Sequence, residues 1–291
     1  MGDRIEVNQF GLQINLDNGE GRIIEGSIVD SIFEPCTTLD ISFECQIRLM
    51  FTADNRNYIR YKSCDFIPIS YSEVYTPNKT WHYEMSCVPL TVGMYLTKAY
   101  ENTRQLATSM ELELLDGSDA LPLKCPLINL HAGEVIQQLR KFHFDDAYMK
   151  GDMKESYFIY CNSKKLMSVK WGKLIASEMR PLVDTPLMMG NNTIFNIDQR
   201  LKNHFHSEKL WKPWNQADYL KKLLGRFIEI ETPIPVAFPA VYTIKFSDTQ
   251  FFDKNVPYLC VRTEQDIMRP DGFTNTFAEI SYLDGRNNNN G

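Results

Sequence analysis

A segment of strict apolar and polar alternation, residues 39–51, constrains the fold of this chain more than any other feature. Its apolar positions are Leu39, Ile41, Phe43, Cys45, Ile47, Leu49 and Phe51, and between them stand Asp40, Ser42, Glu44, Gln46, Arg48 and Met50. A period of two is that of a β-strand with one buried and one wet face. At about 3.3 Å per residue the segment would extend on the order of 40 Å, about twice a usual strand. Strands of that length are typical of walls and tubes.

Similar strand patterns occur on both sides of a central region. Residues 22–33, 58–69 and 81–87 carry β-branched and aromatic residues at strand spacing, and Pro89 is expected to end the last of these strands. The pattern returns at residues 227–231, 241–246, 258–263 and 273–283, and residues 157–161 and 166–171 read as a hairpin.

The central region predicts two helices. In residues 133–142 an apolar face is expected from Val135, Ile136, Leu139 and Phe142, with Glu134, Gln137, Gln138 and Arg140 toward water. In residues 215–225 Asn215 is placed to cap a helix and Gly225 to end it. The intervening residues 179–215 are loop-rich, with several prolines.

These patterns together predict a mainly β (β-rich α+β) fold with two tube-like β-barrel domains and a small helical insertion. We expect a first barrel domain over residues 1–125 and a connecting region of helix, hairpin and loops over residues 126–225. Residues 226–291 are then expected to supply strands that complete the second barrel domain.

Composition restricts the possible function classes. The chain has 291 residues, of which 43% are hydrophobic and 23% charged, so a folded core is expected. A net charge of −6 and the lack of a long Lys/Arg cluster argue against sequence-specific nucleic-acid binding. No apolar run approaches the length of a membrane span and no secretory signal is recognisable, so we expect assembly in the cytoplasm and no stable membrane insertion. The seven cysteines form no CxxC pair and are expected to be small buried hydrophobes rather than disulfide partners or zinc ligands.

Catalytic and metal-binding motifs are missing from the sequence. It contains no Walker loop, GxGxxG, GxSxG, HExxH or EF-hand pattern, and we predict no enzyme, no cofactor and no catalytic or metal-binding residues. The 37 Asp and Glu residues leave a hydrolase dyad open, because a sequence gives no distance between carboxylates.

Several clusters approach a binding site without meeting its requirements. His143 with Asp145 and Asp146 could contribute ligands to a divalent ion, although a solvated helix end is the favoured interpretation. His204 and His206 would share a face of a strand, but their polar neighbours favour a wet loop. The segment Asp116-Gly117-Ser118-Asp119 resembles a calcium loop, yet Leu127 stands where the bidentate glutamate belongs, which favours a turn.

Two aromatic segments could contact ligands. Trp211 and Trp214 could stack on sugar rings, although packing against the helix expected after them is favoured. Trp171 lies in the densest basic stretch, with Lys164, Lys165, Lys170 and Lys173, which is interpreted as a solvated strand and turn.

The order of these elements resembles the central baseplate or tail hub family of tailed bacteriophages and contractile injection systems. The segments that carry the resemblance are Tyr83-Glu84-Met85-Ser86-Cys87, Tyr95-Leu96-Thr97-Lys98-Ala99-Tyr100, residues 134–142, and the hairpin Tyr157-Phe158-Ile159-Tyr160-Cys161 with its turn at residues 162–165. Residues 257–263 and 271–277 are similar to the last two strands of a second tube-like barrel. Members of this family are often longer, so a peripheral domain is expected to be missing here.

The resemblance implies a structural virion protein without catalytic activity, a tail or baseplate hub subunit that joins the tail tube to the central spike and lines the DNA channel. Its implied partners are two further copies of itself in a homotrimer, the tail tube protein, the central spike protein and other baseplate proteins. Asp40 and Glu44 would suit a channel wall, because like charge repels phosphate, whereas Arg48 on the same face weakens that effect. The alternatives are a carbohydrate- or receptor-binding β protein, an enzyme with an unrecognised carboxylate site, or another tail component such as a tube or wedge protein.

Overall fold

The computed structural model describes the chain in several ranges, separated by gaps. These ranges are 4–6, 12–17, 21–49, 59–61, 64–96, 99–123, 130–162, 164–175, 180–182, 193–195, 224–232, 235–244, 257–269 and 272–280.

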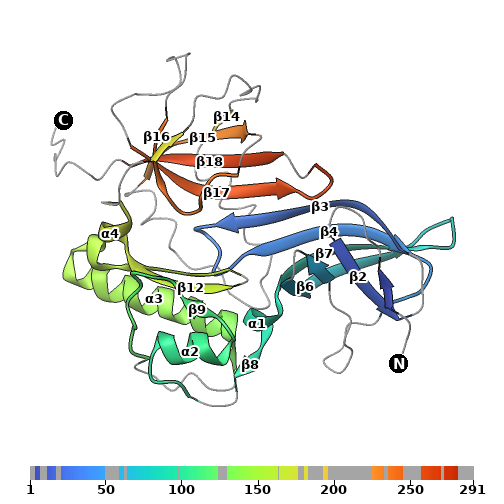
Figure 1. Ribbon diagram of the computed structural model, residues 1–291, viewed down its shortest axis with the longest axis horizontal. Coiled ribbons are helices and arrows are strands. Elements are labelled where there is room, and N and C mark those ends of the chain that lie inside the picture. Colours follow the sequence, from blue (N-terminus) through green and yellow to red (C-terminus); the bar gives the residue numbers. More distant parts are fainter. Residues whose placement is uncertain are drawn as a thin grey trace.

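A sheet of 13 strands dominates the described part of the chain. Its strands are β1 (Arg4–Glu6), β2 (Leu12–Asp17), β3 (Gly21–Ser31), β4 (Thr38–Cys45), β5 (Ile59–Tyr61), β6 (Cys64–Tyr75), β7 (Trp81–Pro89), β13 (Arg180–Leu182), β14 (Thr193–Phe195), β15 (Leu224–Thr232), β16 (Val241–Ile244), β17 (Tyr258–Asp266) and β18 (Phe273–Ile280). Their order is β1-β2-β5-β6-β7-β4-β3-β17-β18-β15-β14, with β16 pairing with both β13 and β17. The sheet is seen in the upper and right-hand parts of Figure 1.

Strands from the two ends of the sequence meet in the middle of this sheet. β3 and β17 are antiparallel neighbours, with Ser31 opposite Arg262 and Ser27 opposite Asp266. The backbone N–H of Ile32 also donates to the carbonyl of Val261 at 3.0 Å. Strands β1 to β7 and strands β15 to β18 therefore share one hydrogen-bonded sheet.

The predicted mainly β class is confirmed, and the predicted barrels are not. Among the described residues the large sheet runs from β1 to β14 as an open order, and no pairing closes it into a barrel. The sequence predicted strands correctly but could not show that β3 would take β17 as its neighbour. The division at residues 125 and 226 stays a prediction.

The strand of strict alternation is shorter than predicted. β4 ends at Cys45. This residue pairs with Gly21 of β3 and with Trp81 of β7, and both of these are the end residues of their strands. Burial of its apolar face is confirmed, since Leu39, Ile41 and Phe43 are all at most 3% exposed. Phe51 lies outside the described residues.

A second layer of helices and short strands lies below the sheet in Figure 1. It contains the helices α1 (Leu90–Gly93), α2 (Thr103–Ser109), α3 (Ala132–Lys150) and α4 (Trp171–Ile175), and the 3-10 turn η1 (Met153–Glu155). Two small sheets complete it, β8 (Tyr95–Leu96) with β10 (Leu130–His131), and β11 (Tyr157–Cys161) with β12 (Lys165–Lys170) and β9 (Glu113–Leu114). The predicted hairpin of β11 and β12 is confirmed. None of the helices in the described part of the chain is long and apolar enough to span a membrane.

The predicted helix at residues 133–142 is confirmed as part of α3, but two of its side chains were placed wrongly. Val135, Ile136 and Leu139 are buried as expected, whereas Phe142 is 41% exposed. Arg140, expected to face water, is only 1% exposed, because Ile32 and Glu34 from a distant loop lie beside it.

The second predicted helix is wrong at its carboxyl end. Gly225 lies inside β15, where it is part of an extended strand rather than a helix terminator. Residues 215–223 lie outside the described residues.

Separate hydrophobic clusters fix the layers to one another. The apolar face of β4 and β7 packs with Ile23, Phe66 and Ile267 in one cluster. A second cluster joins helices α1 to α3 to Ile159 and Leu166 of the small sheet. A third cluster packs Phe158 and Trp171 against Leu259 and Val261 of β17. The small layer thus packs against part of the large sheet.

Candidate functional site: an acidic face of the large sheet

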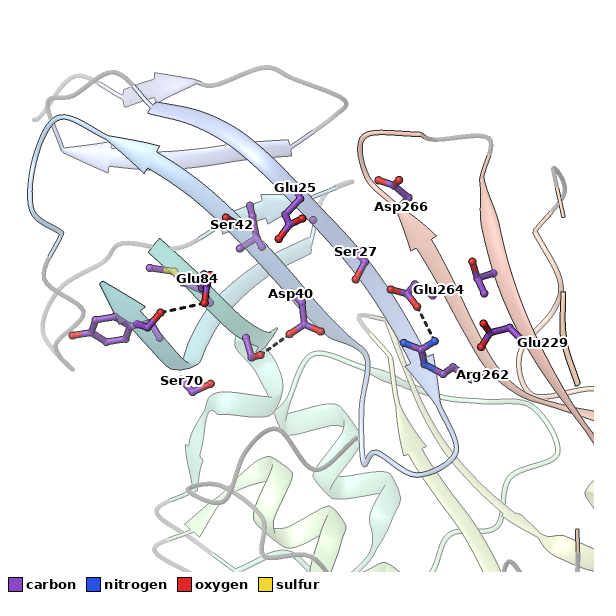
Figure 2. A pocket seen from close by; sticks show the side chains of 17 residues that line it. Glu25, Ser27, Asp40, Ser42, Ser70, Glu84, Glu229, Arg262, Glu264 and Asp266 are labelled. Carbon is purple, nitrogen blue, oxygen red and sulfur yellow. Dashed lines mark hydrogen bonds and ion pairs between the residues drawn. The ribbon is translucent and has the colours of Figure 1, made fainter. Parts of the chain in front are cut away.

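An open groove of about 920 Å³ follows the polar face of the large sheet. Strands β3, β4, β6, β7, β15, β17 and β18 all contribute to it. Among the described residues its carboxylates are Glu25, Asp40, Glu84, Glu229, Glu264 and Asp266, and its one guanidinium is that of Arg262. Figure 2 shows these side chains on the face that the strands present together.

Strand alternation places these side chains on one face. In β4 the residues Leu39, Ile41 and Phe43 enter the core, so Asp40 and Ser42 point to the opposite side. The register continues this polar row across the sheet, because Asp40 pairs with Ser86 of β7 and with Ser27 of β3. The polar positions of successive strands thus form one surface.

The structure gives partners for several of the described groove side chains. Arg262 forms an ion pair with Glu264 at 2.7 Å, which neutralises the one guanidinium of the groove. Ser86 donates to Asp40 at 2.5 Å and Ser72 donates to Glu84 at 3.4 Å, both neutral donors (Figure 2). Six carboxylates against one guanidinium give the described lining an excess of negative charge, which disfavours anions such as phosphates.

Among the described residues no group of His, Cys, Asp and Glu side chains has the geometry of a metal site. Outside the groove lining, His82 lies 3.9 Å from Glu44 and 3.7 Å from Glu84, a partly exposed cluster next to the acidic face. The groove therefore presents distributed negative charge rather than a convergent ligand set.

The three charged residues proposed for the channel wall have different places. Asp40 lines the groove, and its place on a channel wall stays a prediction. Glu44 lies opposite His82 and close to it, beyond the groove lining. Arg48 was placed wrongly, because it lies past the end of β4, where it bonds to Glu73 and stacks 5.0 Å over the ring of Trp81. It therefore does not dilute the charge of the groove.

The other groove carboxylates were not predicted as a group. Glu25, Glu84 and Glu264 stand on strands that are distant in sequence. The sequence shows each of them as a polar position in an alternating strand pattern. It does not show that they share one surface, because that depends on the order of the strands in the sheet.

Two of the clusters that approached an ion site have ordinary structural roles. Asp145 and Asp146 bind Lys141 and Lys150 along α3, each at 2.7 Å, and the ring of His143 packs on that of Tyr157. Asp116 to Asp119 form a turn, in which Gly117 has a φ of +79° that a side chain would disfavour. The turn agrees with the favoured interpretation of residues 116–119, whereas residues 143–146 lie inside α3, which continues to Lys150, rather than at a helix end.

The basic stretch around Trp171, predicted to be a solvated strand and turn, is only partly solvated. Lys170 bonds to Glu155, which raises the pKa of the lysine, and Lys173 donates to the carbonyl of Gly117 at 2.8 Å. Trp171 is not solvated, because it begins α4 and its ring lies 5.2 Å from Phe158 in the core. Lys164 is exposed and Lys165 half-buried.

The candidates His204, His206, Trp211 and Trp214 lie outside the described residues.

A buried polar cluster was missed altogether. Tyr160 of β11 donates to Asp30 of β3 at 2.6 Å, and Thr37 donates to the same carboxylate oxygen at 2.6 Å. Arg140 of α3 donates to the carbonyl of Ile32, and burial lowers the pKa of its guanidinium to about 10 while the charge of Glu34 opposes that change. These bonds connect the helical layer to the large sheet.

Comparisons with known proteins found fold neighbours and no sequence relatives. No family model matches the sequence, and no curated protein matches it. Among solved structures, the 43 kDa tail protein of prophage MuSo2 from Shewanella oneidensis has a TM-score of 0.52 at 7% identity, over 92% of this chain and 97% of that chain.

The chain shares its fold with a phage tail protein. Two further structures match with lower scores. The E. coli c3393 protein, a component of the type VI secretion system, has a TM-score of 0.49 at 10% identity, over 94% of this chain and 77% of that chain. A tail protein from Neisseria meningitidis MC58 has a TM-score of 0.47 at 11% identity, over 90% of this chain and 95% of that chain. The resemblance stated from the sequence is thus confirmed at the level of the fold.

Proposed function

We propose that this chain is a non-enzymatic structural subunit of a tail or baseplate hub, which joins a tail tube to a central spike and lines the DNA channel. The observation that carries the proposal is the acidic groove, which extends over strands from β6 to β15 on the polar face of one sheet. A surface with this excess of negative charge repels phosphates and so lets DNA pass without binding it. The fold shared with a tail protein supports the structural role.

In this proposal three copies surround the channel, with the acidic faces inward. The tail tube protein, the central spike and other baseplate proteins are the neighbours, and assembly takes place in the host cytoplasm before release of the virion. A closed ring would also cover sheet edges, which otherwise pair with other chains.

Two measurements test the architecture. Light scattering of the chain co-purified with its tail partners should give a component three times the 33.8 kDa chain mass, and electron microscopy should place it on the tail axis. Location at the particle periphery, or a persistent monomer in that complex, would refute the hub assignment.

Charge reversal tests the channel wall. Glu25 and Glu84 are exposed in the groove, so Glu25→Lys with Glu84→Lys should leave folding intact and create binding points for phosphate. We expect particles that assemble normally but release DNA about tenfold more slowly, a size typical of surface-charge effects on rates.

The matched control reverses two exposed carboxylates of the small layer, Glu101→Lys with Glu113→Lys, and changes the net charge equally. This control should release DNA at the normal rate. Equal release by both double variants would contradict a channel function of the acidic face.

A further inference from the structure

Cys36 and Cys161 stand directly opposite each other although they lie 125 positions apart in the sequence. They form an isolated parallel bridge between the loop after β3 and the last residue of β11. Two backbone bonds fix it, from the N–H of Thr37 to the carbonyl of Cys161 at 3.0 Å and from the N–H of Cys161 to the carbonyl of Pro35 at 2.9 Å.

This register brings the two side chains within reach of a disulfide. Paired backbones lie about 4.7–4.9 Å apart, and disulfides span Cα separations of about 4.4–6.8 Å. Directly paired residues also project to the same side of a two-stranded bridge. Both side chains belong to the same hydrophobic cluster and are fully buried.

Both groups are thiols in this structure. Burial raises the pKa of each thiol, and the neighbouring Cys161 raises that of Cys36 further. A protonated, buried thiol reacts slowly, so the pair is stable in a reducing cytoplasm and oxidises only when local opening exposes it.

We propose that Cys36 and Cys161 are a cross-link site that closes to a disulfide in an oxidising medium. This inference rests on the proposed function in one respect, that the protein passes from the cytoplasm into a released particle. There, disulfides form and persist. The bond would join the loop after β3 to the end of β11, and so fasten the small layer to the large sheet.

The oxidant is a low-molecular-weight disulfide such as oxidised glutathione. One cysteine thiolate attacks a sulfur of the glutathione disulfide and releases one glutathione thiolate, which leaves a mixed disulfide. The second cysteine thiolate then attacks the protein-bound sulfur and releases the second glutathione thiolate. Two protons pass to the two leaving thiolates, so two protein thiols are oxidised and one glutathione disulfide is reduced.

The test refolds the full chain in a buffer of oxidised and reduced glutathione, because unfolding removes the barrier that burial imposes. Alkylation and mass spectrometry should find five of the seven cysteines free and a peptide that joins Cys36 to Cys161. Since the bond closes a long loop, the oxidised protein should unfold about 5–10 °C above the reduced one.

Matched variants separate this bond from general oxidation. Cys161→Ser keeps a donor for the carbonyl of Asn162, which Cys161 contacts at 3.3 Å, and should abolish both the linked peptide and the thermal shift. Cys45→Ser likewise keeps a donor for the carbonyl of Ile47, at 3.0 Å, and should retain both. Cys36→Ala is the second disabling variant should Cys161→Ser fold poorly.

Seven free thiols after refolding would overturn the proposal, because only incompatible geometry then explains them. A linked peptide of Cys161 with Cys64, whose thiol also raises the pKa of Cys161, would overturn it as well. Neither result bears on the hub assignment, which is tested by location and by DNA release.

Discussion

At the scale of single residues, the most consequential feature is a carboxylate that serves two layers at once. Asp30 belongs to β3 of the large sheet, and it accepts from Tyr160 of the small sheet and from Thr37 of the loop between β3 and β4. Burial raises the pKa of Tyr160, and Asp30 raises it further because the hydroxyl donates to the carboxylate. The tyrosine therefore stays neutral and keeps donating.

Removal of this hydroxyl should destabilise the protein. Tyr160→Phe deletes a bond to a charged acceptor but leaves Thr37 bonded to Asp30, so we expect a loss of about 1–2 kcal/mol in the free energy of unfolding. Urea unfolding followed by circular dichroism measures it.

Tyr157→Phe is the matched control. That hydroxyl donates to Asp119 at 3.0 Å in an exposed position, so its loss should cost about 0.5 kcal/mol or less. Equal losses in the free energy of unfolding for Tyr160→Phe and Tyr157→Phe would show that the buried hydrogen bond contributes no more than the exposed one.

Stability should fall at alkaline pH. Burial raises the pKa of Cys36, Cys87, Cys161 and Cys260 above the ordinary value of 9.0, and that of Tyr160 above 10.0. The unfolded chain loses these protons first, so their contribution is complete below about pH 9 and is lost as pH rises toward the folded pKa values. Each group adds up to about 1.4 kcal/mol per pH unit to the loss.

Unfolding in urea between about pH 8 and pH 10.5, with a reducing agent present, measures this loss. Cys36→Ala removes one contributing group and should give a shallower decline at high pH than the parent chain. A free energy of unfolding that stays constant above about pH 9.5 would contradict the assignment.

At the scale of elements, α3 shows what an apolar pattern can and cannot specify. Leu139 and Phe142 were predicted on the same buried face, yet Leu139 is 4% exposed and Phe142 is 41% exposed. The helix was predictable from its period, but the width of its covered face depends on the short β11, which packs against only part of it.

Replacing Leu139 and Phe142 separately with alanine measures how much of the surface of α3 is covered. Leu139→Ala should lower the free energy of unfolding by about 2–4 kcal/mol, because it leaves a cavity in the cluster beneath α3. Phe142→Ala should lower it by less than about 1 kcal/mol, since 41% of this residue is already exposed to water and less burial is lost. Equal losses would mean that Phe142 is covered in solution.

The same limit explains the other differences between sequence and structure. Alternation correctly predicted the buried face of β4. The strand ends where its partner strands end, at Gly21 and Trp81, and no local sequence pattern indicates that position. Arg140 was assigned to water because a charge is usually solvated, and the loop that buries it lies more than 100 positions away. For the acidic groove, the polar half of each strand was predictable, and the strand order that joins those halves was not.

At the scale of the whole molecule, the pairing of β3 with β17 joins strands from the two ends of the chain into one sheet. We call this pairing the seam. Ile267, just after β17, is fully buried in the cluster of the amino-terminal strands, and its N–H donates to the carbonyl of Gly26 at 2.9 Å. The acidic groove crosses this seam, with Glu25 on one side and Glu264 on the other. A continuous groove therefore requires that both halves stay joined.

Ile267→Ala tests that coupling. The variant should lower the free energy of unfolding by about 2–4 kcal/mol, and hydrogen exchange should show equal losses of protection in β4 and in β18, which lie on opposite sides of the seam. Ile24→Ala, a change of the same side chain at a 40% exposed position of β3, should alter protection by less than about 1 kcal/mol. Loss of protection in β4 alone would mean that the two halves unfold independently, and the groove would then be a contact between separate units rather than the face of one sheet.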